Sequence, residues 1–238
     1  MRTIFLSMAL SLIANITYCT DYYVNASTGS DVLINGTSEN PWKTITYALS
    51  CISGSGHTVH VSAGIYNTDL GETFPIMMVD GVSLSGFGID MSIIDAQSSG
   101  MSVFKCIGII DVSTKLEGFT IRGGAGSEGG GLYISAGSIL NINNNKITAN
   151  TATNGSGIYI TNATPLITNN LISSNGSYCI YITSSSPVIK GNTITNNSTH
   201  SLHITGSTSS PGIINNVIAK NTDDGIYCEF CRRPLKLF

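Results

Sequence analysis

Two adjacent carboxylates near the end of the chain, Asp223 and Asp224, are of a residue type that could do acid–base or metal chemistry. Hydrolysis of a glycosidic bond requires two carboxyl groups facing one substrate bond, one as the acid and one as the base or nucleophile. Between Glu128 and Asp223 the sequence contains no Asp or Glu. This long stretch carries neither a carboxylate pair nor the acidic oxygens that hold calcium. We therefore predict no catalytic residue, no metal site and no cofactor.

Asp223 and Asp224 themselves have two interpretations. They precede Gly225, and because Asp and Gly are common turn formers, a turn before a strand is the favoured one. The alternative is a polysaccharide lyase or glycoside hydrolase that uses these two residues, with calcium as the cofactor if it is a lyase. The alternative also holds if the site lies in a missing carboxyl-terminal part or among earlier charged residues, which are Asp90, Asp95, Asp111, Glu117, Arg122 and Glu128.

A ring-bearing residue recurs at one position of a short apolar motif, which reads Gly-Ile-Tyr-Ile in a regular copy such as Gly157–Ile160. If the motif forms a strand, its two Ile side chains face inward and the ring between them faces outward. The residues at this position are Tyr133, Tyr159, Tyr181, His203 and Tyr227. Flat rings with polar tips suit carbohydrate, so we predict that this column binds a glycan. The alternative is stacking that only supports neighbouring strands.

A second motif recurs once in each repeat, in register with the first, and together they indicate the architecture. Asn-x-Ile-x-x-Asn recurs from Asn145, Asn170, Asn192 and Asn216, at spacings of 25, 22 and 24 residues. Such a period also fits leucine-rich repeats, but residues 129–221 contain 16 Ile against 5 Leu and no helix-forming segment. Coils of a parallel β-helix, stacked about 4.8 Å apart, explain the pattern better. The four Asn would then form a structural ladder at one turn.

One helix signal precedes the repeats. Asn40-Pro41 is a typical helix start, because Asn caps free N–H groups and Pro suits the first helical position. The apolar residues that follow at helical spacing are Trp42, Ile45, Leu49 and Ile52. We predict a helix over 41–52, inside an amino-terminal unit of strand, loop and capping helix at 21–56. About seven coils follow at 57–228, then an irregular or truncated tail at 229–238.

The first twenty residues have the layout of a secretory signal peptide. Arg2 precedes an apolar run from Ile4 to Ile16, and polar residues follow. The run is shorter than the roughly 20 residues that a membrane-spanning helix needs. We therefore predict a signal peptide at 1–20, a secreted or cell-surface location and no membrane span.

The composition excludes some classes of partner. Only 11% of the residues are charged, the net charge is -3 and the pI is about 5.7, whereas nucleic-acid binders carry basic patches. The five cysteines after the signal peptide are interpreted as structural rather than metal-binding, with their pairing left open. These are Cys51, Cys106, Cys179, Cys228 and Cys231.

These features together resemble the right-handed parallel β-helix, or pectate-lyase-like, superfamily. The amino-terminal part resembles a cap module of unknown function that begins many secreted β-helices. The motifs that carry the resemblance include Tyr23-Val24, Gly29-Ser30-Asp31, Gly36-Thr37, Pro41-Trp42-Lys43-Thr44-Ile45, Val59-x-Val61, Gly64-x-Tyr66, Gly86-x-Gly88 and Gly118-Phe119-Thr120-Ile121. The resemblance implies an all-β fold, a single-stranded right-handed parallel β-helix solenoid with a short amino-terminal capping helix. The superfamily includes lyases, hydrolases, epimerases, adhesins and stalks, so it specifies no activity.

The segment Asn221–Gly225 is similar to the first acidic motif of polygalacturonase-type hydrolases, but the other motifs of that family have no counterpart here. The sequence therefore predicts an exported, non-catalytic cell-surface or carbohydrate-contact module. Its partner would be a polysaccharide or cell-surface glycan, with no nucleic acid. Because Pro234 stops the last coil, a partner or a missing segment is expected to cover the carboxyl-terminal end.

Overall fold

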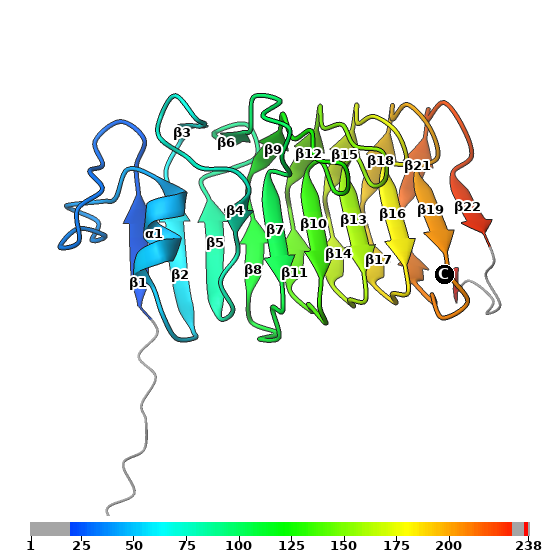
Figure 1. Ribbon diagram of the computed structural model, residues 1–238, viewed down its shortest axis with the longest axis horizontal. Helices are drawn as coiled ribbons and strands as arrows, with labels where there is room; N and C mark the ends of the chain where they lie inside the picture. The colour runs from blue at the N-terminus through cyan, green and yellow to red at the C-terminus, as the bar shows by residue number, and fades with distance from the viewer. Residues whose placement is uncertain (1–19, 230–235, 238) are drawn as a thin grey trace, which may run out of the picture.

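Three parallel β-sheets wind around one core to form a right-handed parallel β-helix of about seven turns. The computed structural model describes residues 20–229 and 236–237, so the predicted signal peptide lies outside the described residues except for Thr20. The coils stack side by side from the amino-terminal to the carboxyl-terminal end (Figure 1). Each of the seven complete coils contributes one strand to each sheet, and sheet A has one additional strand at either end. The fold prediction is confirmed.

The strands of each sheet are hydrogen-bonded in a single parallel order. Sheet A has nine strands: β1 (Asp21–Val24), β2 (His57–Val61), β5 (Val82–Gly86), β8 (Lys115–Glu117), β11 (Asn141–Asn143), β14 (Leu166–Thr168), β17 (Val188–Lys190), β20 (Gly212–Ile214) and β23 (Lys236–Leu237). Sheet B has seven: β3 (Gly64–Tyr66), β6 (Ser92–Asp95), β9 (Thr120–Arg122), β12 (Lys146–Thr148), β15 (Leu171–Ser173), β18 (Thr193–Thr195) and β21 (Val217–Ala219). Sheet C also has seven: β4 (Ile76–Met77), β7 (Phe104–Ile107), β10 (Leu132–Ser135), β13 (Ile158–Thr161), β16 (Ile180–Thr183), β19 (Leu202–Thr205) and β22 (Ile226–Glu229).

The core consists of columns of stacked Ile side chains. In sheet B, for example, Ile121, Ile147 and Ile172 are register partners on successive strands, and none of them is exposed. Period-2 alternation places one face of each short strand inward, and burying one such side chain contributes about 2 kcal/mol. The repeated Ile positions therefore set the register of every coil, because a slip of one residue would turn them outward.

Buried asparagines hold the turns between sheets A and B. Asn170 is typical: its Oδ1 accepts hydrogen bonds from the backbone N–H (2.9 Å) and Nδ2 (3.2 Å) of Asn145, and its Nδ2 donates to the carbonyl of Ile142 (2.9 Å). The same contacts continue through Asn192 and Asn216. The residue before each of the four is Asn or Gly in the left-handed region, where these residue types are tolerated best: Asn144, Asn169, Gly191 and Asn215.

A second ladder of the same kind lies at the turn between sheets B and C, and the sequence analysis did not predict it. Its members are Asn150, Asn175, Asn197 and Asn221. They are the second Asn of the Asn-x-Ile-x-x-Asn motif, so the signal was in the sequence. The two ladders satisfy backbone groups that would otherwise be buried without partners at both turns.

The observed helix is shorter than the helix predicted over 41–52, and it starts later in the chain. Helix α1 spans Ile45–Cys51, and its N-cap is Thr44, whose Oγ1 accepts a hydrogen bond from the backbone N–H of Tyr47. Asn40-Pro41 is not the start, because the chain there is still extended: Trp42 forms a parallel bridge with Val24 of β1. Helix α1 packs against β1 and β4 at the amino-terminal end (Figure 1), burying one apolar face in the core.

Glu72 completes the cap of this helix from a distant loop. Its carboxylate accepts hydrogen bonds from the backbone N–H groups of Ile45 (2.6 Å) and Thr46 (2.9 Å), and only 4% of the residue is exposed. A carboxylate is favourable at a helix N-terminus because the free N–H groups carry partial positive charge. Burial raises the pKa of Glu72, and the hydrogen bonds from Thr46 and Ile45 oppose that rise.

Replacing Glu72 by alanine is expected to lower the free energy of unfolding by about 3 kcal/mol, because two backbone donors lose their only charged acceptor. The comparison is Asp90→Ala, which removes an ion pair with Lys146 from a carboxylate side chain that is 76% exposed, and which should cost less than about 1 kcal/mol. Urea denaturation of both variants measures the difference. Equal losses would mean that Glu72 does not cap the helix.

The carboxyl-terminal tail is not wholly irregular. Among its described residues, Glu229 ends β22, and Lys236–Leu237 forms β23, which pairs in parallel with β20. Of the cysteines, Cys51, Cys106 and Cys179 are free thiols, whereas Cys228 is disulfide-bonded. The disulfide agrees with the structural role predicted for Cys228. Within the described ranges, no helix combines the length and the apolar character that crossing a bilayer requires.

Candidate functional site

The five ring-bearing residues of the repeat form one column along the outer face of sheet C. Strand pairing makes each a register partner of the next, from β10 to β22, in this order: Tyr133, Tyr159, Tyr181, His203 and Tyr227. The first three rings are stacked with centroids 5.5 Å apart, and Tyr181 stacks on His203 at 4.7 Å. The register places side chains of one kind above each other at the strand spacing.

The column is less open than the sequence analysis predicted. Tyr159 is 8% exposed and His203 5%, whereas Tyr227 reaches 38%. The faces of the rings are covered by their neighbours, so a ligand can meet mainly ring edges and hydroxyl groups. Burial raises the pKa of Tyr159 to about 12, with a further contribution from Glu128, and burial also raises the pKa of Tyr181. These phenols are therefore neutral hydrogen-bonding groups at ordinary pH.

His203 is buried because Tyr178 covers it. Tyr178 lies in the turn before β16, and its ring meets that of His203 edge-on at 4.6 Å. Burial lowers the pKa of His203, the nearby Glu229 carboxylate (3.4 Å from Nε2) opposes this, and His200 lowers it further. The imidazole is thus neutral near pH 7. The equivalent position of this turn holds Ser156 in the coil before and His200 in the coil after, so no repeated residue type marks Tyr178 and the sequence pattern could not show this contact.

A hollow of about 240 Å³ adjoins the amino-terminal end of the ring column. Its lining includes Lys105, Glu128 and Tyr133, and the Nζ of Lys105 lies 5.5 Å from the centre of the Tyr133 ring. Lys105 is the register partner of Tyr133 on β7, so it continues the column with a cation in place of a ring. Glu128 and Tyr133 are among the residues predicted from the sequence, whereas Lys105 is not, although the strand alternation marks it as outward-facing. The ammonium over the aromatic face is a cation–π contact.

The other charged residues of the early coils form ion pairs, turn hydrogen bonds or part of a separate hollow. Arg122 Nε donates to Asp95 Oδ2 at 2.8 Å between β9 and β6, and Lys146 pairs with Asp90 at 3.3 Å. Asp111 accepts two hydrogen bonds from Ser113, which lower its pKa, in a short turn. Glu117 lies on sheet A, in a hollow of about 420 Å³ that is also lined by His57, His60 and Lys115. These charged residues therefore lie at separate places on the early coils rather than in one group.

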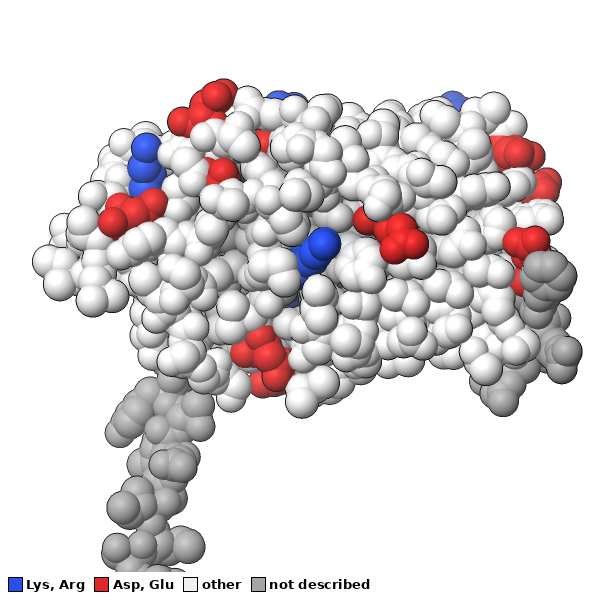
Figure 2. Space-filling view, in the orientation of Figure 1, with Lys and Arg blue, Asp and Glu red and all other residues white. Residues whose placement is uncertain are grey.

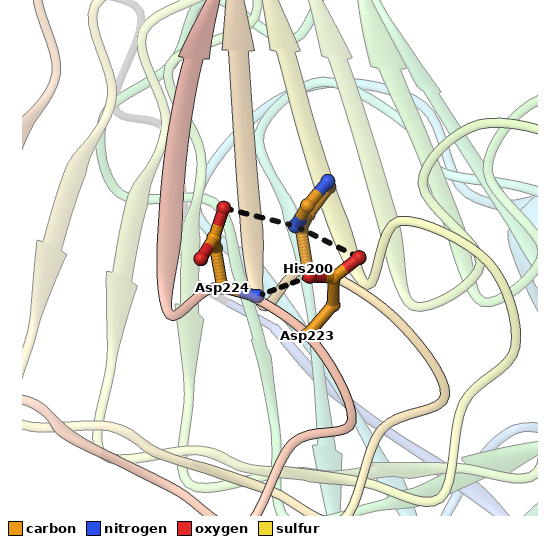
Figure 3. Close-up of side chains that lie close together, drawn as sticks. All are labelled: His200, Asp223 and Asp224. Carbon is orange, nitrogen blue, oxygen red and sulfur yellow. Dashed lines mark hydrogen bonds and ion pairs between the residues drawn. The ribbon is translucent and has the colours of Figure 1, made fainter.

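Asp223 and Asp224 lie in the bend that precedes β22, and a residue from the previous coil meets them. The Nδ1 atom of His200 is 3.6 Å from Asp223 Oδ2 and 3.9 Å from Asp224 Oδ2 (Figure 3). Among residues 20–229 and 236–237, these three form the only group of His, Cys, Asp or Glu side chains placed to share one ion. The contact with His200 is not predicted from the sequence, because His200 lies 23 residues before Asp223.

Charged side chains are sparse on the surface. The face shown in Figure 2 carries a few separate acidic and basic groups on an otherwise uncharged surface. The chain has 11 Lys and Arg against 14 Asp and Glu, which together are 11% of its residues. Recognition on such a surface must rely on hydrogen bonds and on shape, and only locally on charge.

The fold is similar to those of several solved structures, including a pectate lyase and a pectin methylesterase. Pectate lyase Pel9A matches with a TM-score of 0.62 and 16% identity over 86% of this chain, which spans only 55% of the lyase. Pectin methylesterase from carrot matches with a TM-score of 0.51 and 13% identity, over 91% of this chain and 83% of the esterase. At these identities the similarity shows the fold alone.

Comparison with curated protein sequences gave no significant match. Residues 27–231, which include helix α1, strands β2 to β22 and the three residues His200, Asp223 and Asp224, match the family described as protein of unknown function (DUF1565). The solved structures confirm the fold that the sequence resemblance implied. The chain is therefore a β-helix protein that belongs to the DUF1565 family.

Proposed function

We propose that this protein is an exported, non-catalytic β-helix that contacts carbohydrate outside the cell or at its surface. The observation that carries the proposal is the outer face of sheet C. There the column from Tyr133 to Tyr227 runs along the solenoid and meets the hollow beside Lys105 and Glu128. A linear glycan laid along this face would meet a series of equivalent groups, one from each coil.

Hydrogen bonding, rather than stacking, would hold the glycan. Because the ring faces are covered, the phenol hydroxyls of the half-buried Tyr133 and Tyr181 are the groups that offer contacts. Lys105 and Glu128 add one donor and one acceptor at the end of the column. Each neutral hydrogen bond contributes only about 1 kcal/mol, so affinity should be modest and should grow with the length of the glycan.

Two further features support export and a carbohydrate partner. Residues 1–20 have the charge and apolar pattern of a signal peptide. The solved structures with this fold include a pectate lyase and a pectin methylesterase, whose names refer to pectic polysaccharide. Neither similarity identifies the glycan for this chain, so the test must begin with a panel.

The double variant Tyr133→Phe with Tyr181→Phe is expected to weaken glycan binding at least about tenfold while leaving the melting temperature unchanged. It removes two hydroxyls but keeps both rings and their stacking. Calorimetric titration with neutral and acidic oligosaccharides of increasing length measures this. The matched control is Tyr23→Phe, which removes a hydroxyl from the ring stacked on His60 beside sheet A. If the wild type binds no glycan, or if Tyr23→Phe alone weakens binding, the sheet C proposal is wrong.

A second candidate is an enzyme, either a polysaccharide lyase or a glycoside hydrolase. The observation that favours it is that an amine and a carboxylate, Lys105 and Glu128, line one hollow in the early coils. Turnover on acidic and neutral polysaccharides, with and without calcium, tests it. Activity lost in Lys105→Ala or Glu128→Gln would replace the non-catalytic proposal, and loss in Asp223→Ala or Asp224→Ala would place the site at the other end of the column.

A further inference from the structure

We propose that His200, Asp223 and Asp224 form a binding site for a divalent transition-metal ion such as Zn²⁺ (Figure 3). The site would join the last two complete coils, because His200 lies in the turn before β19 and the two carboxylates lie in the bend before β22. It adjoins the carboxyl-terminal end of the ring column, because the His200 ring stacks on Tyr227, but its ligand is an ion and not a glycan.

The spacing of the ligand atoms suits such an ion. One nitrogen and two carboxylate oxygens all lie within 4.8 Å of one another, and the nitrogen is 3.6 and 3.9 Å from the two oxygens. Tetrahedral coordination with bonds of about 2.1 Å places ligand atoms about 3.4 Å apart. To bring all three atoms onto one ion, the two nitrogen–oxygen distances would have to shorten by a few tenths of an ångström, and the separation of the two oxygens, which is at most 4.8 Å, by up to about 1.4 Å. Rotation of the exposed Asp223 and Asp224 side chains can supply such a movement.

The Nδ1 atom of His200 has no hydrogen-bond partner among the described residues. It is shielded from solvent and makes no hydrogen bond, since both carboxylate oxygens lie beyond hydrogen-bonding distance. A buried polar atom without a partner is costly, and a metal ion would accept its lone pair. Asp223 and Asp224 are more than half exposed, at 56% and 65% of their side chains, so an ion can enter from solvent and keep water as a further ligand.

Neighbouring groups hold the three side chains in this arrangement. The His200 ring is stacked between Tyr227, at 4.7 Å and 8°, and Tyr178, at 5.7 Å and 19°, which fixes the direction of Nδ1. The backbone N–H of Asp224 donates to Asp223 Oδ1 at 3.0 Å, which leaves Oδ2 facing the imidazole. Such support for a ligand is typical of sites that bind metal well.

The donor set selects the class of metal. An imidazole with two carboxylates suits Zn²⁺ and its neighbours among the first-row transition metals. Calcium and magnesium prefer oxygen ligands throughout and should bind this site poorly. The two adjacent negative charges would also repel each other less with a cation between them.

The test is calorimetric titration of untagged, EDTA-treated protein with ZnCl₂, with CaCl₂ and MgCl₂ as comparisons. One Zn²⁺ per chain and a higher melting temperature with zinc are expected. His200→Phe keeps a ring between Tyr178 and Tyr227 but has no nitrogen, and it should weaken zinc binding at least about 100-fold. The double variant Asp223→Asn with Asp224→Asn should do the same.

The matched control is His60→Phe. His60 also contacts a carboxylate, with Nε2 3.0 Å from Asp21 Oδ1, but only one, and that pair is exposed. This variant should bind zinc as the wild type does. The proposal is overturned if His200→Phe retains wild-type zinc binding, if His60→Phe abolishes it, or if zinc leaves the wild-type melting temperature unchanged. None of these results would affect the glycan titrations, which are performed in EDTA.

Discussion

Replacing Asn192 by aspartate should destabilise the protein by about 4 kcal/mol at pH 7, one of the two largest effects that we expect from a single substitution. Asn192 is 1% exposed, and its Nδ2 donates to the carbonyl of Ile167 (2.9 Å) and to Asn216 Oδ1 (3.0 Å). In the variant a carboxylate oxygen would face these two oxygens with no proton between them. The ladder would therefore be broken in the middle of the stack.

The loss should depend on pH in a specific direction. Burial and the two facing oxygens would raise the pKa of the new carboxyl above the value of about 3.9 that it has in the unfolded chain. The folded state would then bind more protons than the unfolded state, so the variant would be most stable below pH 4 and would lose stability as pH rises. Urea denaturation at pH 4 and pH 7 should show a larger gap from the wild type at pH 7.

The control for this substitution lies in the same coil. Asn196 is exposed and has the positive φ of 55° that both Asn and Asp tolerate, so Asn196→Asp should change the free energy of unfolding by less than about 0.5 kcal/mol. If the two variants are equally stable at pH 7, the buried ladder does not hold the coils together.

Replacing Trp42 by alanine should lower the free energy of unfolding by about 4 kcal/mol, which is the other large effect that we expect. Trp42 is 3% exposed, stacks on Tyr22 at 5.4 Å and donates from Nε1 to the carbonyl of Val32. The loop passes so close to the indole that a Cβ on Gly36 would lie 2.7 Å from the ring. Its removal would leave a large cavity and would release the loop that covers the first coil.

The control for this substitution is Phe87→Ala, and thermal unfolding of both variants measures the difference in stability. Phe87 is also a large aromatic residue, but it is 72% exposed and should cost less than about 0.5 kcal/mol when truncated. Similar melting temperatures for the two variants would show that the amino-terminal cap contributes little to the stability of the solenoid.

Local chemistry could predict the parts of this fold that repeat. A contact between equivalent residues of neighbouring coils is visible in the sequence as a period, as with Ile147 over Ile172 or Asn170 over Asn192. The same logic placed the ring column on one sheet. It did not predict the exposure of the column, because stacking covers ring faces and because Tyr178 follows no repeat.

The start of the helix shows where local signals fail. Asn40-Pro41 has the chemistry of a helix start, yet Trp42 pairs with Val24, and Asp31 accepts hydrogen bonds from the backbone N–H groups of Lys43 and Thr44. These tertiary contacts keep the segment extended up to the N-cap. The competing partners come from residues more than ten positions away, so no window of the sequence contains them.

The sequence by itself determined the solenoid, its register and the absence of a carboxylate pair in the regular coils, because these depend on residue type and period alone. Only the tertiary structure decided which unlike side chains meet across neighbouring coils. His200 reaches Asp223, and Lys105 lines a hollow with Glu128. Such pairs lie about one coil apart in the chain and occur once, so no period marks them, and their contact follows from the exact length of each turn between strands.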